Sequence, residues 1–165
     1  MNPLRPLLLA GLALALAGCA PKTETAAAPA APASPGAASA ADLAAGKAVY
    51  QRICMACHMA DGNGVPATFP PLNGSELLAE ADPGKVIRIV LHGLQGPLEV
   101  KGKPFNSMMP PQGALLKDHE IAQVLTYVRA TYGNGAPPVT ADAVAAIRQN
   151  VPRPTPWTWA ELNQK

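Results

Sequence analysis

The chain has 165 residues, which is enough for one modest domain with additional segments at its ends. Aromatic residues make up only 4 % of the sequence, so side chains alone would give a thin core that a large apolar cofactor could complete. The formal net charge of +2 is close to neutral and gives no reason to expect a nucleic-acid partner. With 19 prolines and 14 glycines, we expect many loops and tails.

Residues 1–18 have the pattern of an export signal. A short positive start precedes an apolar stretch over residues 7–17, about half of the ~20 residues that a membrane-spanning helix needs. The segment ends in Leu16-Ala17-Gly18-Cys19, which resembles the lipobox of bacterial lipoproteins, where the signal is cut before an acylated cysteine. We therefore predict a lipidated Cys19 that anchors the chain on the periplasmic side of a bacterial membrane. An ordinary signal peptide with a chance cysteine is the alternative.

Residues 19–41 are predicted to be the lipidated cysteine and a tether. After Cys19 the sequence is nearly all Ala, Pro, Ser, Thr and Gly, without the apolar periodicity that a packed core requires. A flexible coil of this length reaches roughly 25–30 Å. Such a tether would let a small domain meet partners above a membrane.

A folded domain is predicted over residues 42–135. Asp42 is expected to cap a helix whose apolar positions, from Leu43 to Ile53, have roughly helical spacing. Turn residues and two consecutive prolines make residues 60–74 a loop.

Further helices are expected over residues 75–80, 82–92 and 118–132. The last of these is the clearest, because an apolar stripe runs along it and a Gly-Asn-Gly sequence ends it. Between them, residues 93–113 are expected to be irregular, with a small hairpin around residues 98–104.

Residues 136–165 are predicted to be a C-terminal extension. Thr140 is expected to cap a short helix over residues 141–149, and the proline-rich stretch 151–159 is expected to have no regular structure. This stretch contains Trp157 and Trp159, which would either strap the tail onto the domain, as we expect, or offer a docking segment to a partner.

Cys54, Cys57 and His58 form a Cys-x-x-Cys-His sequence, the attachment motif of c-type haem. The two thiols reach two vinyl groups on one side of the macrocycle, and the histidine then lies beneath the iron. A thioredoxin-like site would need a βαβ setting, a zinc site would need further ligands, and a disulfide would leave His58 unexplained. The sequence has three cysteines, so lipidation of Cys19 and one covalent haem would account for all of them.

Several short sequences occur in the order typical of one family. They are Gly46-x-x-x-Tyr50, Cys54-x-x-Cys57-His58, Pro70-Pro71-Leu72-x-Gly74, Met109-Pro110 and Val124-Leu125-Thr126-Tyr127-Val128-Arg129. Together they resemble a class I monohaem cytochrome c, especially domains that accompany quinoprotein dehydrogenases or are fused to copper nitrite reductases. The resemblance implies an all-α fold of three to five short helices around one covalently bound haem. It also implies that the first and last helices cross, where Gly46 and Tyr50 would meet Val124 and Tyr127.

The same resemblance implies the iron ligands. His58 would be one axial ligand, with its imidazole N–H held by the carbonyl of Pro70. Met109, directly before a proline, would be the other. Its neighbour Met108 and the bis-histidine candidate His92 are the alternatives for this second position.

Further residues are expected around the haem. Candidate pocket residues are Phe69, Leu72, Ile89, Leu94, Phe105, Leu116 and Leu125. Arg88 or Lys101 is a guess for a haem-propionate partner. Lys47, Arg52, Lys101 and Lys103 would form a mildly basic rim for acidic partners, or would simply be scattered solvated charges.

Three functions follow from these expectations. The first is a lipid-tethered electron carrier between periplasmic redox proteins, without catalytic residues, small-molecule substrate or nucleic acid. The second is a non-catalytic haem subunit of a dehydrogenase or reductase complex. The third, an enzyme or gas sensor with an open iron site, is disfavoured by the methionine ligand.

Overall fold

The computed structural model describes residues 37–133 and 135–164. The predicted signal peptide, Cys19 and most of the predicted tether therefore lie outside the described residues. Among the residues that are described, no helix has the length and apolar character needed to cross a membrane.

The first helix begins earlier than expected. α1 spans Ala40–Val49, and its N-cap is Ser39, whose side chain accepts a hydrogen bond from the Asp42 N–H. The Ser39 hydroxyl also donates to the Asp42 carboxylate at 2.6 Å, so the two residues cap the helix together. The prediction that Asp42 is the cap is wrong, because the serine three residues earlier already satisfies an N–H of the first turn.

The chain continues from α1 into the Cys-x-x-Cys-His motif without a break. A π-helical turn spans Tyr50–Cys54, and α2 spans Met55–His58. The N–H of Met55 donates to the carbonyl of Tyr50, which is the wider spacing of a π-helix. The predicted helix does run into the motif, but through a turn type that is often found at functional sites.

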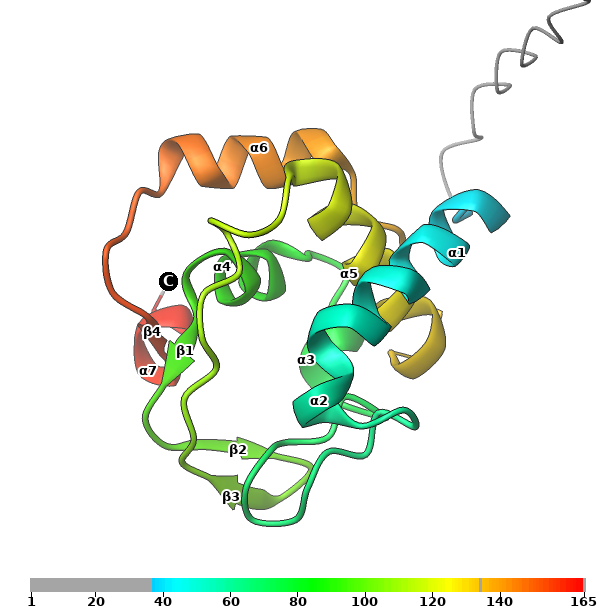
Figure 1. Ribbon diagram of the computed structural model, residues 1–165. Helices are drawn as coiled ribbons and strands as arrows, with labels where there is room; N and C mark the ends of the chain where they lie inside the picture. The colour runs from blue at the N-terminus through cyan, green and yellow to red at the C-terminus, as the bar shows by residue number, and fades with distance from the viewer. Residues whose placement is uncertain (1–36, 134, 165) are drawn as a thin grey trace, which may run out of the picture. The chain divides into compact units, whose positions relative to one another are not determined.

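The longest helix crosses the first one. α5 spans Asp118–Tyr132, the predicted bounds, and Figure 1 shows α1 lying across it. At the crossing, a Cβ on Gly46 would lie 2.1 Å from the carbonyl oxygen of Gln123 and 2.8 Å from the Cβ of Tyr127. The Tyr50 and Tyr127 rings pack beside this point with centroids 5.6 Å apart. The predicted crossing is confirmed, and it needs glycine because any side chain would push the backbones apart.

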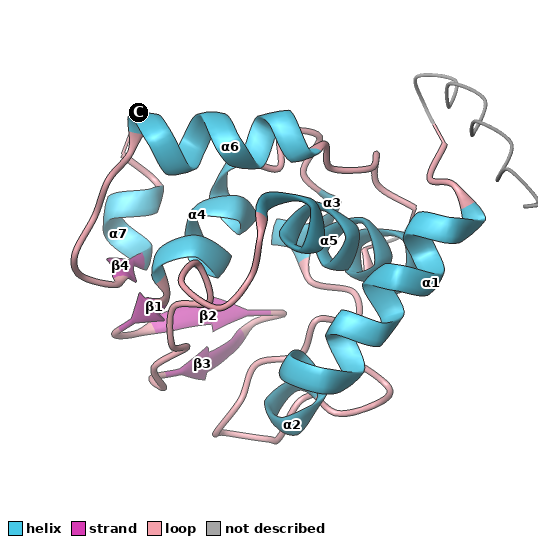
Figure 2. Cartoon of the chain, turned by 45° about the horizontal axis from the view of Figure 1, so that its top comes forward, coloured by secondary structure: helices cyan, strands magenta, loops and turns pink. Residues whose placement is uncertain are grey.

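Two shorter helices and a hairpin lie between α2 and α5. α3 spans Glu76–Ala79 and α4 spans Gly84–His92. The predicted hairpin is present as β2, Leu98–Val100, paired antiparallel with β3, Lys103–Phe105. Figure 2 shows these strands beside the helices, together with the short strand β1, Leu94–Gln95.

The C-terminal extension packs against the domain. α6 spans Ala141–Asn150 and is capped by Thr140, as predicted. The tail then forms β4, Trp157–Thr158, parallel to β1, and α7, Trp159–Leu162. The prediction of an irregular tail over residues 151–159 is therefore wrong at its end, because β1 offers a free edge to which β4 adds.

Two groups of buried side chains support this arrangement. The larger lies mainly between α1, α4, α5 and α6, and its fully buried members include Ile87, Ile121 and Val144. The smaller contains Ile89, Leu94 and Leu162, with Trp157, Trp159 and Met109 packed against it. The tail thus straps onto the domain through its tryptophans, as expected.

Candidate haem site

A cavity opens between the Cys-x-x-Cys-His segment and the stretch that carries Met109. Its empty volume is about 1160 Å³, part of it open to solvent. The lining is almost entirely apolar, with Ser75, Ser107 and Gln112 as the polar side chains other than His58. Cys54, Cys57, His58 and Met109 all line this cavity, so residues far apart in the sequence meet at one place.

Cys54 and Cys57 lie on the π-turn and on α2, both partly buried at the cavity wall. Burial, with a smaller contribution from Cys57, raises the pKa of the Cys54 thiol to about 11. A free thiol with this pKa stays protonated near neutral pH, which is unsuitable for a redox-active thiolate. Among residues 37–133 and 135–164, no group of three His, Cys, Asp or Glu side chains could hold a metal ion. The pair therefore suits thioether attachment better than a zinc or thioredoxin-like site.

His58 is oriented by the loop that follows it. Its Nδ1 lies 3.0 Å from the carbonyl oxygen of Pro70. Because a carbonyl can only accept a hydrogen bond, Nδ1 carries the proton and Nε2 keeps its lone pair. Burial lowers the pKa of His58, with the Pro70 carbonyl opposing that shift, so the ring is neutral at physiological pH. A neutral imidazole with a free Nε2 is the state that binds iron.

Met109 is held on the other side of the cavity by backbone pairing. Its N–H donates to the carbonyl of Leu94 at 2.8 Å, and its carbonyl accepts from the Leu94 N–H at 3.0 Å. Met109 is half-buried among apolar side chains, whereas Met108 is 61 % exposed. Both methionines line the cavity, but the pairing with β1 buries Met109 further and leaves Met108 largely exposed to solvent.

Most of the predicted pocket residues line the cavity. Six of them do so: Phe69, Leu72, Ile89, Leu94, Leu116 and Leu125. The exception is Phe105, which is buried opposite Leu98 in the hairpin and does not line the cavity. Sequence reasoning missed Leu98 and Val100 as lining residues, because it left undecided which face of the hairpin would turn inward.

The matching family model is that of cytochrome c, over residues 43–131. The chain belongs to the cytochrome c family. It is 41 % identical to a cytochrome c-552 of Thermus thermophilus, over 62 % of this chain and 83 % of that relative.

Other relatives of this cytochrome are subunits of larger enzymes. It is 39 % identical to the gluconate 2-dehydrogenase cytochrome c subunit of Pantoea cypripedii and 36 % identical to the quinone-dependent alcohol dehydrogenase cytochrome c subunit of Gluconobacter oxydans (strain 621H). The chain spans only 25 % and 22 % of the lengths of these two subunits.

The residues of this cytochrome fit a covalently bound haem c. The cavity is apolar, its wall carries the two cysteines of the attachment motif, and a neutral histidine and a methionine sulfur are available for the iron. A bound haem supplies reversible one-electron chemistry at its iron. The protein is an electron-transfer protein rather than a catalytic enzyme.

The candidate ligand His92 and the propionate candidates do not line the cavity. His92 does not line it; its Nε2 is enclosed near the tail, where Val151 and Arg153 lie. Arg88 on α4 does not line it either, and the Lys101 ammonium donates to the carbonyl of Asn73 at 3.2 Å. Neither propionate prediction is supported by this placement.

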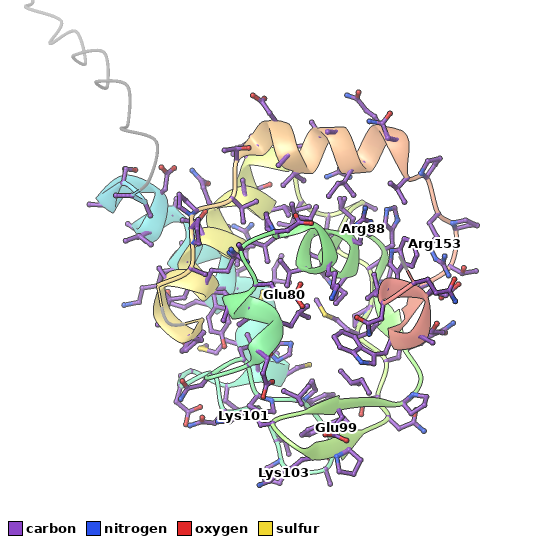
Figure 3. The ribbon with its side chains drawn as sticks, turned by 180° about the vertical axis from the view of Figure 1, so that it is seen from behind. Glu80, Arg88, Glu99, Lys101, Lys103 and Arg153 are labelled. Carbon is purple, nitrogen blue, oxygen red and sulfur yellow. The ribbon has the colours of Figure 1, made fainter. Side chains whose placement is uncertain are left out.

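The four predicted rim cations do not form one basic patch. Arg52 pairs with Glu120 at 3.0 Å, and Lys101 and Lys103 share the hairpin with Glu99, as Figure 3 shows. The alternative of scattered, solvated charges describes these residues better.

One hydrogen bond across the cavity could not be predicted from the sequence. The hydroxyl of Ser107, next to the two methionines, donates to the carbonyl of Thr68, in the loop that carries Pro70. This bond joins the histidine side and the methionine side of the site.

Proposed function

We propose that this cytochrome carries single electrons between periplasmic redox proteins while a lipid on Cys19 tethers it to a bacterial membrane. The observation that carries the electron-transfer part is the placement of His58 and Met109 at one cavity. Two protein ligands close the iron, so the reaction left to the haem is gain and loss of an electron.

The tether is supported by sequence alone. The Leu16-Ala17-Gly18-Cys19 segment follows an apolar stretch, and the Ala/Pro-rich residues after it separate the cysteine from the folded part. Acyl chains on Cys19 would give stable attachment without a membrane-spanning helix. Because a tethered carrier stays near the membrane, its donor and acceptor would be membrane-bound or periplasmic proteins.

A labelling experiment tests the anchor. Cells expressing the full chain are fed radioactive palmitate, and the cytochrome is purified and counted, with Cys19→Ser as the matched variant. We expect label on the wild type, none on Cys19→Ser, and haem in both. Equal labelling of the two proteins, or none in the wild type, would contradict lipidation of Cys19.

A second candidate is a haem subunit of a dehydrogenase complex. It is favoured by the relatives named as cytochrome c subunits of gluconate and alcohol dehydrogenases. Mild detergent extraction of native membranes, followed by purification through a tag on this chain, separates the two candidates. A cytochrome that purifies alone supports the free carrier, whereas a stoichiometric partner with dehydrogenase activity supports the subunit.

A further inference from the structure

The backbone is strained directly after the proposed axial ligand His58. Met59 ends α2 with φ 62° and ψ 165°, a combination found almost only in glycine, because a side chain crowds the backbone there. A non-glycine residue keeps such a conformation only when its surroundings hold it. Because Met59 directly follows His58, the contacts that hold Met59 act next to the proposed ligand.

Two tyrosine hydroxyls hold the turn. The hydroxyl of Tyr50 donates to the carbonyl oxygen of Met59 at 2.6 Å, and the hydroxyl of Tyr132 donates to the carbonyl oxygen of Ala60 at 2.8 Å. Both tyrosines are buried, with exposed fractions of 1 % and 6 %. Burial raises the pKa of both hydroxyls, so each keeps its proton and remains a donor.

The two tyrosines come from the two helices that cross. Tyr50 follows α1 and Tyr132 ends α5, and their ring centroids lie 5.6 Å apart. The returning loop packs on the same rings, since a Cβ on Gly62 would lie only 2.8 Å from the ring of Tyr132. The helix crossing, visible in Figure 1, is therefore connected directly to the turn after His58.

The turn also determines how the loop returns to the imidazole. The N–H of Gly64 donates to the carbonyl of His58 at 3.1 Å, and the N–H of Leu72 donates to the carbonyl of Gly62 at 2.7 Å. These bonds fix the loop that brings the Pro70 carbonyl to His58 Nδ1. A shift at Met59 would move this loop and lengthen the bond to Nδ1.

We propose that Tyr50 and Tyr132 are positioning residues for His58, which they orient by holding Met59 and Ala60 in the strained turn. This proposal rests on the His58 and Met109 ligation proposed above. A hydrogen bond from Nδ1 makes the imidazole a better electron donor to the iron, which favours the oxidised state. Loss of either hydroxyl should therefore weaken the Pro70 bond and raise the reduction potential.

A third tyrosine, Tyr127, packs against Tyr50 and Tyr132 and provides a control. The ring of Tyr127 lies 5.6 Å from Tyr50 and 6.2 Å from Tyr132, but over the described part of the chain its hydroxyl donates to no backbone carbonyl. Tyr50→Phe, Tyr132→Phe and Tyr127→Phe each remove one hydroxyl from the same cluster and keep the ring. The Tyr127 hydroxyl interacts with the Tyr132 side chain rather than with the turn itself, so Tyr127→Phe should disturb the turn less than the other two.

The experiment measures two quantities on the three holoproteins. One is the midpoint potential, and the other is the hydrogen-exchange rate of the Gly64 amide, measured by NMR. In Tyr50→Phe and Tyr132→Phe we expect a higher potential and exchange faster by on the order of tenfold, with clearly smaller changes in Tyr127→Phe. A lower melting temperature at an unchanged potential would show that the hydroxyls only stabilise the fold, and would overturn the proposal.

A second variant tests the role of the strain. Met59→Gly removes the crowding, so Tyr50→Phe should shift the potential less in that background than in the wild type. Full additivity of the two shifts would overturn the proposal. The failure of the ligation itself is recognised separately, because the wild type would then lack the sulfur-to-iron charge-transfer band of a methionine-ligated oxidised haem.

Discussion

His58 and Met109 reach the same cavity from opposite sides, and each is held by a backbone carbonyl. Pro70 accepts from His58 Nδ1, and Leu94 accepts from the N–H of Met109. The two proposed ligands are therefore positioned by main-chain groups, whose positions depend on loops rather than on neighbouring side chains. Of the two consecutive methionines, only Met109 is paired to Leu94 in this way.

Met109→Ala should remove the sulfur ligand and leave the haem attached. The oxidised protein should lose its long-wavelength sulfur-to-iron absorption band, and its reduction potential should fall because thioether sulfur favours reduced iron. Met108→Ala is the control, since Met108 is 61 % exposed and should keep both properties. Loss of the band in Met108→Ala rather than in Met109→Ala would contradict the assignment.

Gly46→Ala should destabilise the fold although alanine is the better helix former. A Cβ at this position meets the carbonyl of Gln123 on α5 at 2.1 Å, so α1 must move away. The expected cost is about 1–3 kcal/mol in the free energy of unfolding, measured by denaturant titration of the holoprotein. Ala48→Gly, at an exposed position of α1, gives the propensity effect alone, about 1 kcal/mol. A gain of stability in Gly46→Ala would refute the close crossing.

Among the elements, helices with a strong periodic pattern and the local hairpin of β2 and β3 could be predicted, whereas the parallel pairing of β1 with β4 could not. α5 has its predicted bounds because its apolar stripe and its glycine stop agree. β4 depends on the free edge of β1, a non-local contact that no local pattern reveals. The start of α7 could have been predicted, because Thr158-Trp159-Ala160-Glu161 is a capping-box sequence. The prolines before it favoured an irregular segment instead.

Acid should loosen the tail. Glu161 accepts hydrogen bonds from Arg153 at 2.7 Å and from the N–H and hydroxyl of Thr158 at 2.8 Å, which lowers its pKa from 4.5 to about 2. The folded pKa is below the unfolded one, so this contribution to stability is present above pH 4.5 and is lost as the pH falls toward 2.

Tryptophan fluorescence tests this prediction, because both tryptophans lie in the tail segment that Glu161 caps. The emission should shift in part as the pH falls through that range, and Glu161→Gln should show the same partial shift already at neutral pH. Glu99→Gln, on the exposed face of the hairpin, is the control and should behave as the wild type. A Glu161→Gln protein with the wild-type acid transition would refute the role of this carboxylate.

At the scale of the molecule, the C-terminal extension completes the domain rather than hanging from it. Arg148 on α6 donates to Asp118 at 2.7 Å and to the carbonyls of Gly113 and Leu116 at 2.6 and 3.0 Å, just beyond the Met109 stretch. Arg129 is fully buried and donates to the carbonyls of Glu80 and Pro137. The extension therefore contacts both ends of α5.

The haem attachment site could be predicted from the sequence because a covalent motif of fixed spacing needs no tertiary information. The strained turn at Met59 and the inward face of the hairpin were not, since both depend on how distant segments pack. Lys101 likewise gave no local sign that its ammonium would bond to the carbonyl of Asn73.

The central claim is that the iron is closed by two protein ligands and only exchanges electrons. Carbon monoxide tests it most directly, because it binds reduced haem iron only where a coordination position is open. We predict that the absorption spectrum of the dithionite-reduced wild-type protein stays unchanged under carbon monoxide at neutral pH, while reduced Met109→Ala gives the spectrum of a carbonyl complex. Rapid and complete formation of a carbonyl complex by the wild type would contradict the account.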